Sequence, residues 1–396
     1  MPEFGSELAA RSDELRMRDT RTKAFGAMQN ADVLVIGGGM FGAAVGYGLA
    51  RRGLGVTMLD EGDNAFRAAR GNFGLVWYQG KGKGMQRYAD WTLESIRLWP
   101  DFAAGLDSET GVDVGYHKPG GLTIATSEKA LNARKERIEL LRRQAGNKGY
   151  DCEFFDRAQV QALFPEIELV PNVIGGSFSP HDGHANPLKL LRALHAGFAR
   201  HGGRYLPEQE AVRIERRGRD FVVTTPKGVF GAAKVVIAAG HGVTRLAAMV
   251  DIRVPLRPER GQLLVTERTR QVLPVPMSGV RQNDEGTVML GVSNEEVGFD
   301  DSTTLDQTQR IARLAIEKFP ALRHLRLVRT WGALRILTPD GYPVYAESKT
   351  QPGAYALACH SAVTLSAVNA NAISYWIAEG VEPDDFDTFR PERFDA

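Results

Sequence analysis

The feature that most constrains this chain is a glycine-rich turn between two segments of different character. Before the turn, residues 31–36 (ADVLVI) form a short β-branched run that predicts a buried strand. After it, residues 43–52 are rich in alanine and predict a helix that ends at Gly53. The turn itself reads Gly37-Gly38-Gly39-Met40-Phe41-Gly42. A strand, a glycine turn and a helix in this order predict a βαβ dinucleotide-binding unit.

The glycines fall where such a unit needs them. Gly37 permits a tight turn, Gly39 lets a pyrophosphate approach the backbone, and Gly42 lets the helix pack on the strand. Met40 and Phe41 lie in the turn just before the predicted helix, whose N-terminal N–H groups and positive dipole end favour phosphate. A chance glycine-rich turn in an α/β domain is the alternative interpretation.

A second predicted strand, residues 56–59, ends at two acidic residues. Asp60 follows Gly37 by 23 residues, close to the spacing at which an acid accepts hydrogen bonds from the ribose. Glu61 is the alternative, because a shift of one residue exchanges the two. An acid here disfavours a 2′-phosphorylated cofactor, but NAD and FAD both remain compatible with this unit.

Charge and composition exclude several classes of function. The 396 residues include 49 Lys and Arg against 48 Asp and Glu. The chain therefore has no excess of positive charge that would favour binding to nucleic acid or to an anionic membrane. Cys152 and Cys359 cannot form a disulfide framework, and no run of about 18 apolar residues predicts a membrane span. We therefore expect a cytoplasmic protein. Peripheral attachment to the inner membrane through an electron acceptor stays open.

Two segments are interpreted as structurally minor. Residues 1–30 are polar and lack an apolar period, so we treat them as a leader outside the fold, with a short helix over 9–25 as the alternative. His181, Asp182 and His184 lie in a Pro/Gly loop with no further ligand at a suitable spacing. We predict no metal site, and a loop that caps a helix starting at Asn186-Pro187.

Six segments follow one another in a characteristic order. They are residues 35–42 (VIGGGMFG), 182–187 (DGHANP), 238–240 (AAG), 258–262 (PERGQ), 332–341 (GALRILTPDG) and 359–365 (CHSAVTL). In these segments the chain resembles the FAD-dependent D-amino-acid oxidase superfamily, which includes glycine oxidase, sarcosine oxidase and amino-acid and opine dehydrogenases. The resemblance spans about residues 31–380 and implies FAD, bound non-covalently, as the cofactor.

Further cofactor contacts are expected outside the glycine turn. The loop Arg70-Gly71-Asn72-Phe73-Gly74 is suited to contact phosphate and ring atoms. Ala239 and Gly240 follow another predicted buried strand. The resemblance implies that the backbone of Val212 brackets the adenine. It also implies that a helix over 362–378 points its first N–H groups at the flavin pyrimidine, a role that falls to Ala362, Val363, Thr364 and Leu365.

The candidate catalytic residues are Arg335, His360 and Tyr78. Arg335 lies in an apolar run and needs an anionic partner, for which Asp340 is the structural alternative. The resemblance implies that Arg335 grips the substrate carboxylate, which suits a guanidinium fork, and that His360 lines the flavin. A packed, hydrogen-bonded role for His360 is the alternative.

Tyr78 belongs to a loop, residues 77–85, that is predicted to cover the site or to bring Lys81 or Lys83 to a charged substrate. The alternative is a solvated surface loop. Cys359 is interpreted as an inert buried thiol.

We expect an α/β fold with a discontinuous Rossmann-like FAD-binding domain and an interleaved antiparallel α+β substrate domain. The predicted FAD-binding part comprises 31–110, 156–250 and 333–390, and the substrate part 111–155 and 251–332. The expected reaction oxidises the Cα–N bond of an amino acid or secondary amine of the D-amino acid, glycine, sarcosine, proline or opine type.

The expected electron acceptor is oxygen, a quinone or a partner protein, and hetero- or homo-oligomers both stay open. The alternatives are a flavin-bearing component of a multi-subunit dehydrogenase complex with an assembly or relay role, and an NAD-dependent dehydrogenase.

Overall fold

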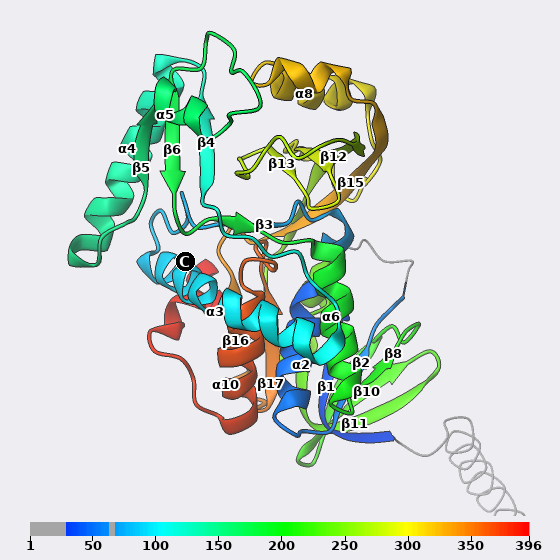
Figure 1. Cartoon of the computed structure of the whole chain (residues 1–396). Coiled ribbons are helices and arrows are strands. Elements are labelled where there is room, and N and C mark those ends of the chain that lie inside the picture. Colours follow the sequence, from blue (N-terminus) through cyan, green and yellow to red (C-terminus); the bar gives the residue numbers. More distant parts are fainter. Residues whose placement is uncertain (1–28, 63–67, 396) are drawn as a thin grey trace, which may run out of the picture.

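The computed structural model describes residues 29–62 and 68–395. The chain forms two stacked parts, with the glycine turn in the lower part and antiparallel sheets in the upper part (Figure 1). The predicted leader lies outside the described residues up to position 28.

A mostly parallel sheet forms the centre of the lower part. Its strands run in the order β16-β17-β11-β1-β2-β8, and β9 and β10 extend it as a hairpin beside β11. The bounds are β1 (Gln29–Ile36), β2 (Val56–Leu59), β8 (Arg204–Leu206), β9 (Arg213–Arg217), β10 (Asp220–Thr225), β11 (Gly228–Ile237), β16 (Val344–Glu347) and β17 (Ala354–Ala358). Because β1 lies between β2 and β11, the glycine turn that follows it opens at the carboxyl edge of the sheet.

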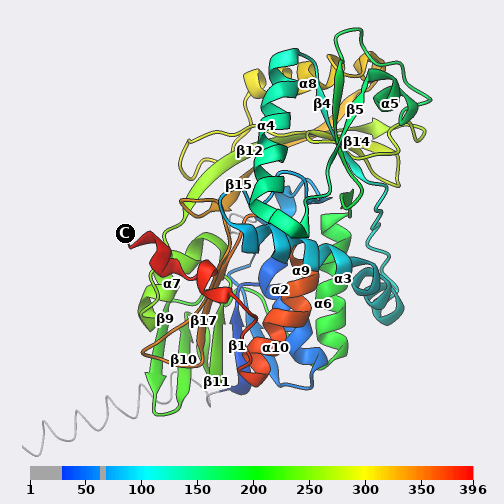
Figure 2. The same cartoon turned by 90° about the vertical axis from the view of Figure 1, so that its left-hand side faces the viewer.

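Helices cover one face of this sheet, and the β9–β10 hairpin with a short helix covers the other (Figure 2). The covering helices are α2 (Met40–Arg51), α3 (Gln86–Thr110), α6 (Pro187–Arg200) and α10 (Ser374–Glu379), and α7 (Val243–Ala247) lies on the opposite face. As predicted, α6 begins at Asn186-Pro187, where the Asn186 side chain accepts hydrogen bonds from the N–H groups of Leu188 and Lys189.

The upper part consists of two antiparallel sheets around a second core. One sheet has the order β13-β14-β12-β15 and the other β4-β6-β5. The bounds are β4 (Gly121–Ala125), β5 (Glu153–Asp156), β6 (Gly175–Ser179), β12 (Arg257–Arg268), β13 (Val280–Gln282), β14 (Thr287–Gly291) and β15 (Leu327–Leu337). Helices α4 (Glu128–Ala145), α5 (Arg157–Ala162) and α8 (Leu305–Ile316) flank them, and the short pair β3 (Leu75–Val76) and β7 (Gly183–His184) lies between the two parts (Figure 1).

The structure confirms the predicted α/β fold with an added antiparallel part and corrects three boundaries. The sequence prediction places residues 156–182 in the FAD-binding domain, but β6 pairs with β4 and β5 and its neighbours share the upper core. Residues 333–337 continue β15 in the upper sheet, because their pairing with β12 is unbroken. The predicted helix over 362–378 begins only at α9 (Ser366–Val368) and continues through a π-helical segment, Asn369–Ile373.

Candidate active site

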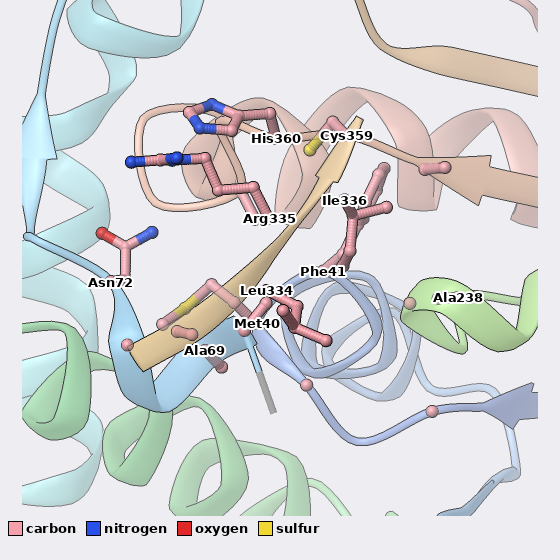
Figure 3. A pocket seen from close by; sticks show the side chains of 18 of the residues that line it. Met40, Phe41, Ala69, Asn72, Ala238, Leu334, Arg335, Ile336, Cys359 and His360 are labelled. Atoms are coloured by element: carbon pink, nitrogen blue, oxygen red, sulfur yellow. The ribbon is translucent and has the colours of Figure 1, made fainter. Parts of the chain in front are cut away.

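A cavity of about 390 Å³ lies between the two parts of the molecule, within the usual size range of ligand sites. Both the carboxyl edge of the parallel sheet and the inner face of β15 contribute to its wall. It therefore joins residues more than 300 positions apart in the sequence, such as Met40 and His360 (Figure 3).

The three motif glycines have three different surroundings. Gly37 has φ +107°, and a Cβ there would lie 2.5 Å from the Ala238 carbonyl oxygen. A Cβ on Gly42 would lie 1.9 Å from the Gly37 carbonyl oxygen, so Gly42 permits the helix to pack and does not itself line the cavity. Gly39 lines the cavity, and a Cβ there would meet no protein atom within 4 Å. The open space beside Gly39 is where the fingerprint requires a pyrophosphate.

The first turn of α2 faces the same space. Met40 and Phe41 line the cavity, and no acidic residue lies in this turn to compete for an anion. The N–H groups that open a helix have no partner within it, so the turn presents donors and a positive dipole end. These residues fit the dinucleotide part of FAD.

Asp60 lines the cavity next to Glu61, and its carboxylate also holds the turn. Oδ2 accepts a hydrogen bond from the Gly38 N–H at 2.6 Å, and Oδ1 accepts one from the Gly62 N–H at 2.9 Å. Asp60 therefore fixes the backbone of the glycine turn in addition to facing the space expected for the ribose.

The other predicted cofactor residues divide into two groups. Those that line the cavity are Gly71, Asn72, Phe73, Ala239, Gly240, Ala362, Val363 and Thr364. Those that do not are Arg70, Gly74, Val212 and Leu365. Ala211 lines the cavity in place of Val212, which is exposed, and Leu365 is fully buried in the core.

Gly71 and Thr364 explain how the flavin-side wall is held together. A Cβ on Gly71 would lie 2.0 Å from the Ala333 side chain, so the loop presses against β15. The Thr364 hydroxyl donates to the Leu75 carbonyl and accepts from the Trp77 N–H, both at 3.2 Å. The Thr364 contacts join β3 and the residue after it to the segment after β17.

Arg335 projects from β15 into the cavity (Figure 3). Its partner is Glu259, directly across the β12–β15 ladder, with Nη1 and Oε1 2.7 Å apart. The predicted structural alternative, a pair with Asp340, is wrong: Asp340 instead binds Arg393, with Nε and Oδ2 2.7 Å apart.

A second contact holds the guanidinium from the other side, since Nη2 donates to the Ser293 carbonyl at 2.7 Å. Within residues 29–62 and 68–395, the Nε–H of Arg335 has no hydrogen-bond partner, and burial lowers the pKa of the group from its usual value while Glu259 opposes that shift. The protein partners of Arg335 thus leave its Nε–H unused.

His360 lies beside the Arg335 guanidinium, and its side chain is exposed to the cavity (Figure 3). Desolvation, with smaller contributions from Lys81 and Arg335, lowers its pKa to about 3. Its imidazole is therefore neutral near pH 7. The adjacent Cys359 also lines the cavity, and burial raises the pKa of its thiol to about 12, as expected for an inert cysteine.

Tyr78 does not reach the cavity. Its ring stacks on Tyr150 with centroids 4.4 Å apart, only 3% of the residue is exposed, and burial raises its pKa. Trp77 and Lys81 of the same loop line the cavity instead. Alternation along an extended segment places neighbours on opposite sides, so the sequence could have separated Trp77 from Tyr78 but not shown which of them faces the cavity.

The loop around Asp182 has a structural role. Its carboxylate accepts hydrogen bonds from the N–H groups of Tyr78 and Gln79 and from the Gln79 side chain, and burial raises its pKa to about 7. His181 pairs with Asp151 at 2.8 Å. No group of metal-ligating side chains occurs in the part of the chain that the structure describes.

Comparison with known proteins identifies the family of the chain. Residues 32–376 match the family described as FAD dependent oxidoreductase. This chain belongs to that family. Its cofactor is FAD, which also removes the NAD-dependent alternative.

The chain is similar to an opine oxidase subunit of Agrobacterium tumefaciens, at 39% identity over 93% of this chain and 99% of the relative. It is similar to glycine oxidase of Geobacillus kaustophilus at 26% identity over 83% of this chain and 87% of that protein. The crystal structure of glycine oxidase from Bacillus cereus has a TM-score of 0.81 and 26% identity, covering 91% of this chain and 98% of that one. Within the described residues, no helix of this family member is both long and apolar enough to cross a membrane.

Proposed function

We propose that this protein oxidises the Cα–N bond of an amino acid or N-substituted amino acid. The observation that carries this proposal is the position of Arg335, which lines the cavity beside His360 and whose Nε–H has no partner among the described residues. A carboxylate bound there would place the substrate Cα within the same cavity as the cofactor. The similarity to glycine oxidase and to the opine oxidase subunit supports a substrate of this type.

The reaction balances without an acid–base pair from the protein. FAD, when bound, would supply the acceptor for the hydride that leaves the substrate Cα. Loss of a proton from nitrogen leaves an imine, and water converts it to an oxo acid and an amine. In this reaction Arg335 holds the substrate carboxylate, and His360 lines the cavity as an uncharged imidazole.

We further propose that electrons leave through a partner chain. The chain is similar to a protein named as one subunit of an oxidase, which supports this proposal. The similarity covers 93% of this chain and 99% of that protein. Oxygen or a quinone as direct acceptor are the alternatives. Mixing the reduced protein with oxygen or a soluble quinone separates them, because a chain that depends on a partner is reoxidised slowly by both.

The experiment that tests the reaction is flavin bleaching in the absence of oxygen. The FAD-loaded protein is mixed with amino acids and N-alkyl amino acids of both configurations, and each is paired with the amine that lacks its carboxylate. We expect bleaching by carboxylate-bearing substrates and none by the matched amines. Bleaching by the amines alone, or by no compound in either set, contradicts the proposal.

A further inference from the structure

The FAD cavity contains a second cation, Lys81, whose surroundings differ from those of Arg335. The Nζ atom of Lys81 donates to the Ser361 hydroxyl at 2.7 Å and lies 5.7 Å from the centre of the Tyr88 ring. No carboxylate among the described residues lies within ion-pair distance of Nζ. Arg335, in contrast, is already paired with Glu259.

The two cations flank one residue. Ser361, which binds Lys81, follows His360 in the chain, and both Lys81 and Arg335 line the cavity beside that imidazole. Each of them also disfavours a positive charge on His360. The Lys81 ammonium and the Arg335 guanidinium are therefore close enough to contact one ligand in the cavity.

The backbone of Lys81 is held in place from both sides. The Tyr150 hydroxyl accepts hydrogen bonds from the N–H groups of Gly80 at 2.8 Å and Lys81 at 3.1 Å. It donates to the Tyr78 carbonyl at 2.8 Å. Gly82 follows with φ +83° and packs so closely on Ala89 that a Cβ would lie 2.6 Å from its side chain. The loop thus aims Lys81 inward, while Lys83, two residues later, is exposed.

A half-buried ammonium with only a hydroxyl as partner favours an anion in the cavity. An ammonium has three donors, of which the Ser361 hydroxyl takes one. Water can satisfy the others, but a substrate that displaces this water must supply acceptors of its own. A carboxylate does so and also balances the charge.

We propose that Lys81 binds a second carboxylate, so that the substrate is a secondary amine carrying a carboxylate on each side of its nitrogen. This inference rests on the proposed function. Arg335 holds the carboxylate next to the carbon that is oxidised, and Lys81 with Ser361 holds the carboxylate of the other nitrogen substituent. Such a compound is an N-(carboxyalkyl) amino acid, so Lys81 selects the opine type among the substrates expected from the sequence.

The test compares two substrates that differ by one carboxylate, N-(1-carboxyethyl)alanine and N-ethylalanine. Flavin reduction without oxygen is measured over a range of concentrations for the FAD-loaded parent, Lys81→Met and Lys83→Met. Lys83→Met is the matched control, since it removes the same charge from the same loop. We expect kcat/KM for the dicarboxylate to fall about 10- to 100-fold in Lys81→Met, chiefly through KM, and little change for N-ethylalanine or in the control.

A binding measurement gives a readout that needs no turnover. Oxydiacetate and methoxyacetate are ethers that cannot form an imine, and their binding is followed by the change in flavin absorbance. The parent should bind oxydiacetate about 10-fold or more tightly than methoxyacetate, and Lys81→Met should lose this difference while Lys81→Arg keeps part of it.

The outcomes separate this inference from the proposed function. If neither amine reduces the parent flavin, the proposed function fails as well. If N-ethylalanine reduces it as well as the dicarboxylate does, or if Lys81→Met slows both equally, the proposed function stands and the second carboxylate site is wrong. An equal decrease in kcat/KM for both substrates would instead indicate that the Lys81 ammonium acts on the flavin and not on the second carboxylate.

Discussion

The two ends of the cavity are built in different ways; we expect the nucleotide part of FAD at one end and the flavin at the other. At the nucleotide end, one short stretch of chain supplies Gly37, Gly39 and Asp60, and the shape depends on backbone contacts such as the Gly38 N–H with Asp60 Oδ2. At the flavin end, Lys81, Arg335 and His360 come from three distant segments. Their positions depend on side-chain contacts such as those of Arg335 with Glu259 and of Lys81 with Ser361.

This difference predicts different consequences for substitutions. The nucleotide end is part of the lower core, so changes there affect folding or cofactor retention. The flavin end forms where the upper sheet meets the lower part, so single side chains there can change without loss of the fold. The following predictions test that separation.

The largest expected effect is that of Gly42→Val, compared with Gly39→Val. A Cβ on Gly42 would lie 1.9 Å from the Gly37 carbonyl oxygen, a backbone atom that cannot move aside without disrupting β1 and α2. We expect a loss of more than about 4 kcal/mol in the free energy of unfolding, or no soluble protein. Gly39→Val should fold, because its side chain has space, but should not retain FAD.

Urea unfolding by circular dichroism and the flavin content of purified protein check both variants. A folded, FAD-loaded Gly42→Val protein would contradict the packing role. Full FAD retention by Gly39→Val would contradict the placement of the pyrophosphate.

The same contrast explains what the sequence could predict. The glycine turn, the acid after β2 and the cap of α6 follow from residues close together in the chain, and all three are present as predicted. The partner of Arg335 could not be read in this way, because Glu259 lies across a ladder whose register the sequence does not state. The sequence analysis names Tyr78 as catalytic and leaves Lys81 and Lys83 as alternatives for the same reason, since only the packing of Tyr78 on Tyr150 shows which side of the loop faces inward.

A large effect on activity without loss of the fold is expected for Arg335→Ala. Removing a charged partner at a binding site costs about 2–5 kcal/mol, so kcat/KM should fall some thirtyfold to several thousandfold. Arg335→Lys should recover only part of this loss, since an ammonium cannot reproduce the guanidinium fork. The FAD content should stay normal. Arg329→Ala, an exposed arginine on the same strand, is the control.

Anaerobic stopped-flow reduction and flavin content are measured on the same preparations. Because Arg335→Ala leaves Glu259 without its partner, the double variant with Glu259→Gln shows whether any loss of stability comes from that carboxylate. A folded, FAD-loaded Arg335→Ala protein that is reduced as fast as the parent would show that Arg335 does not bind the substrate.

A smaller effect, confined to the cofactor, is expected for Asp60→Ala. A hydrogen bond to a charged acceptor contributes about 1.5–3 kcal/mol, so FAD affinity should fall roughly ten- to a hundredfold. The rate of flavin reduction in the protein that retains FAD should change little, because Asp60 lies at the opposite end of the cavity from His360. Glu61→Ala is the matched variant, and equilibrium dialysis of FAD measures both. If only Glu61→Ala weakens binding, the ribose contact belongs to Glu61.

The smallest expected effect is a dependence of the free energy of unfolding on pH, caused by the buried His184. Desolvation, with Arg281 nearby, lowers the pKa of this buried histidine to about 3. Its Nδ1 lies 3.3 Å from Arg281 Nη1. Arg281 also donates to the carbonyl of Phe73, in the loop formed by residues 70–74. The neutral imidazole is the form that can accept a hydrogen bond from Arg281.

The unfolded chain takes up a proton on this histidine near pH 6.5, whereas the folded protein does so only near pH 3. Stability is therefore lost as the pH falls below 6.5, by about 1.4 kcal/mol per pH unit, or about 2 kcal/mol at pH 5. His184→Gln keeps an acceptor for Arg281 without this titration, so its urea midpoint should fall less between pH 7 and pH 5 than that of the parent. His324→Gln, at an exposed position, controls for the loss of a histidine. If the urea midpoints of His184→Gln and the parent fall equally between pH 7 and pH 5, protonation of His184 does not contribute to the loss of stability in acid.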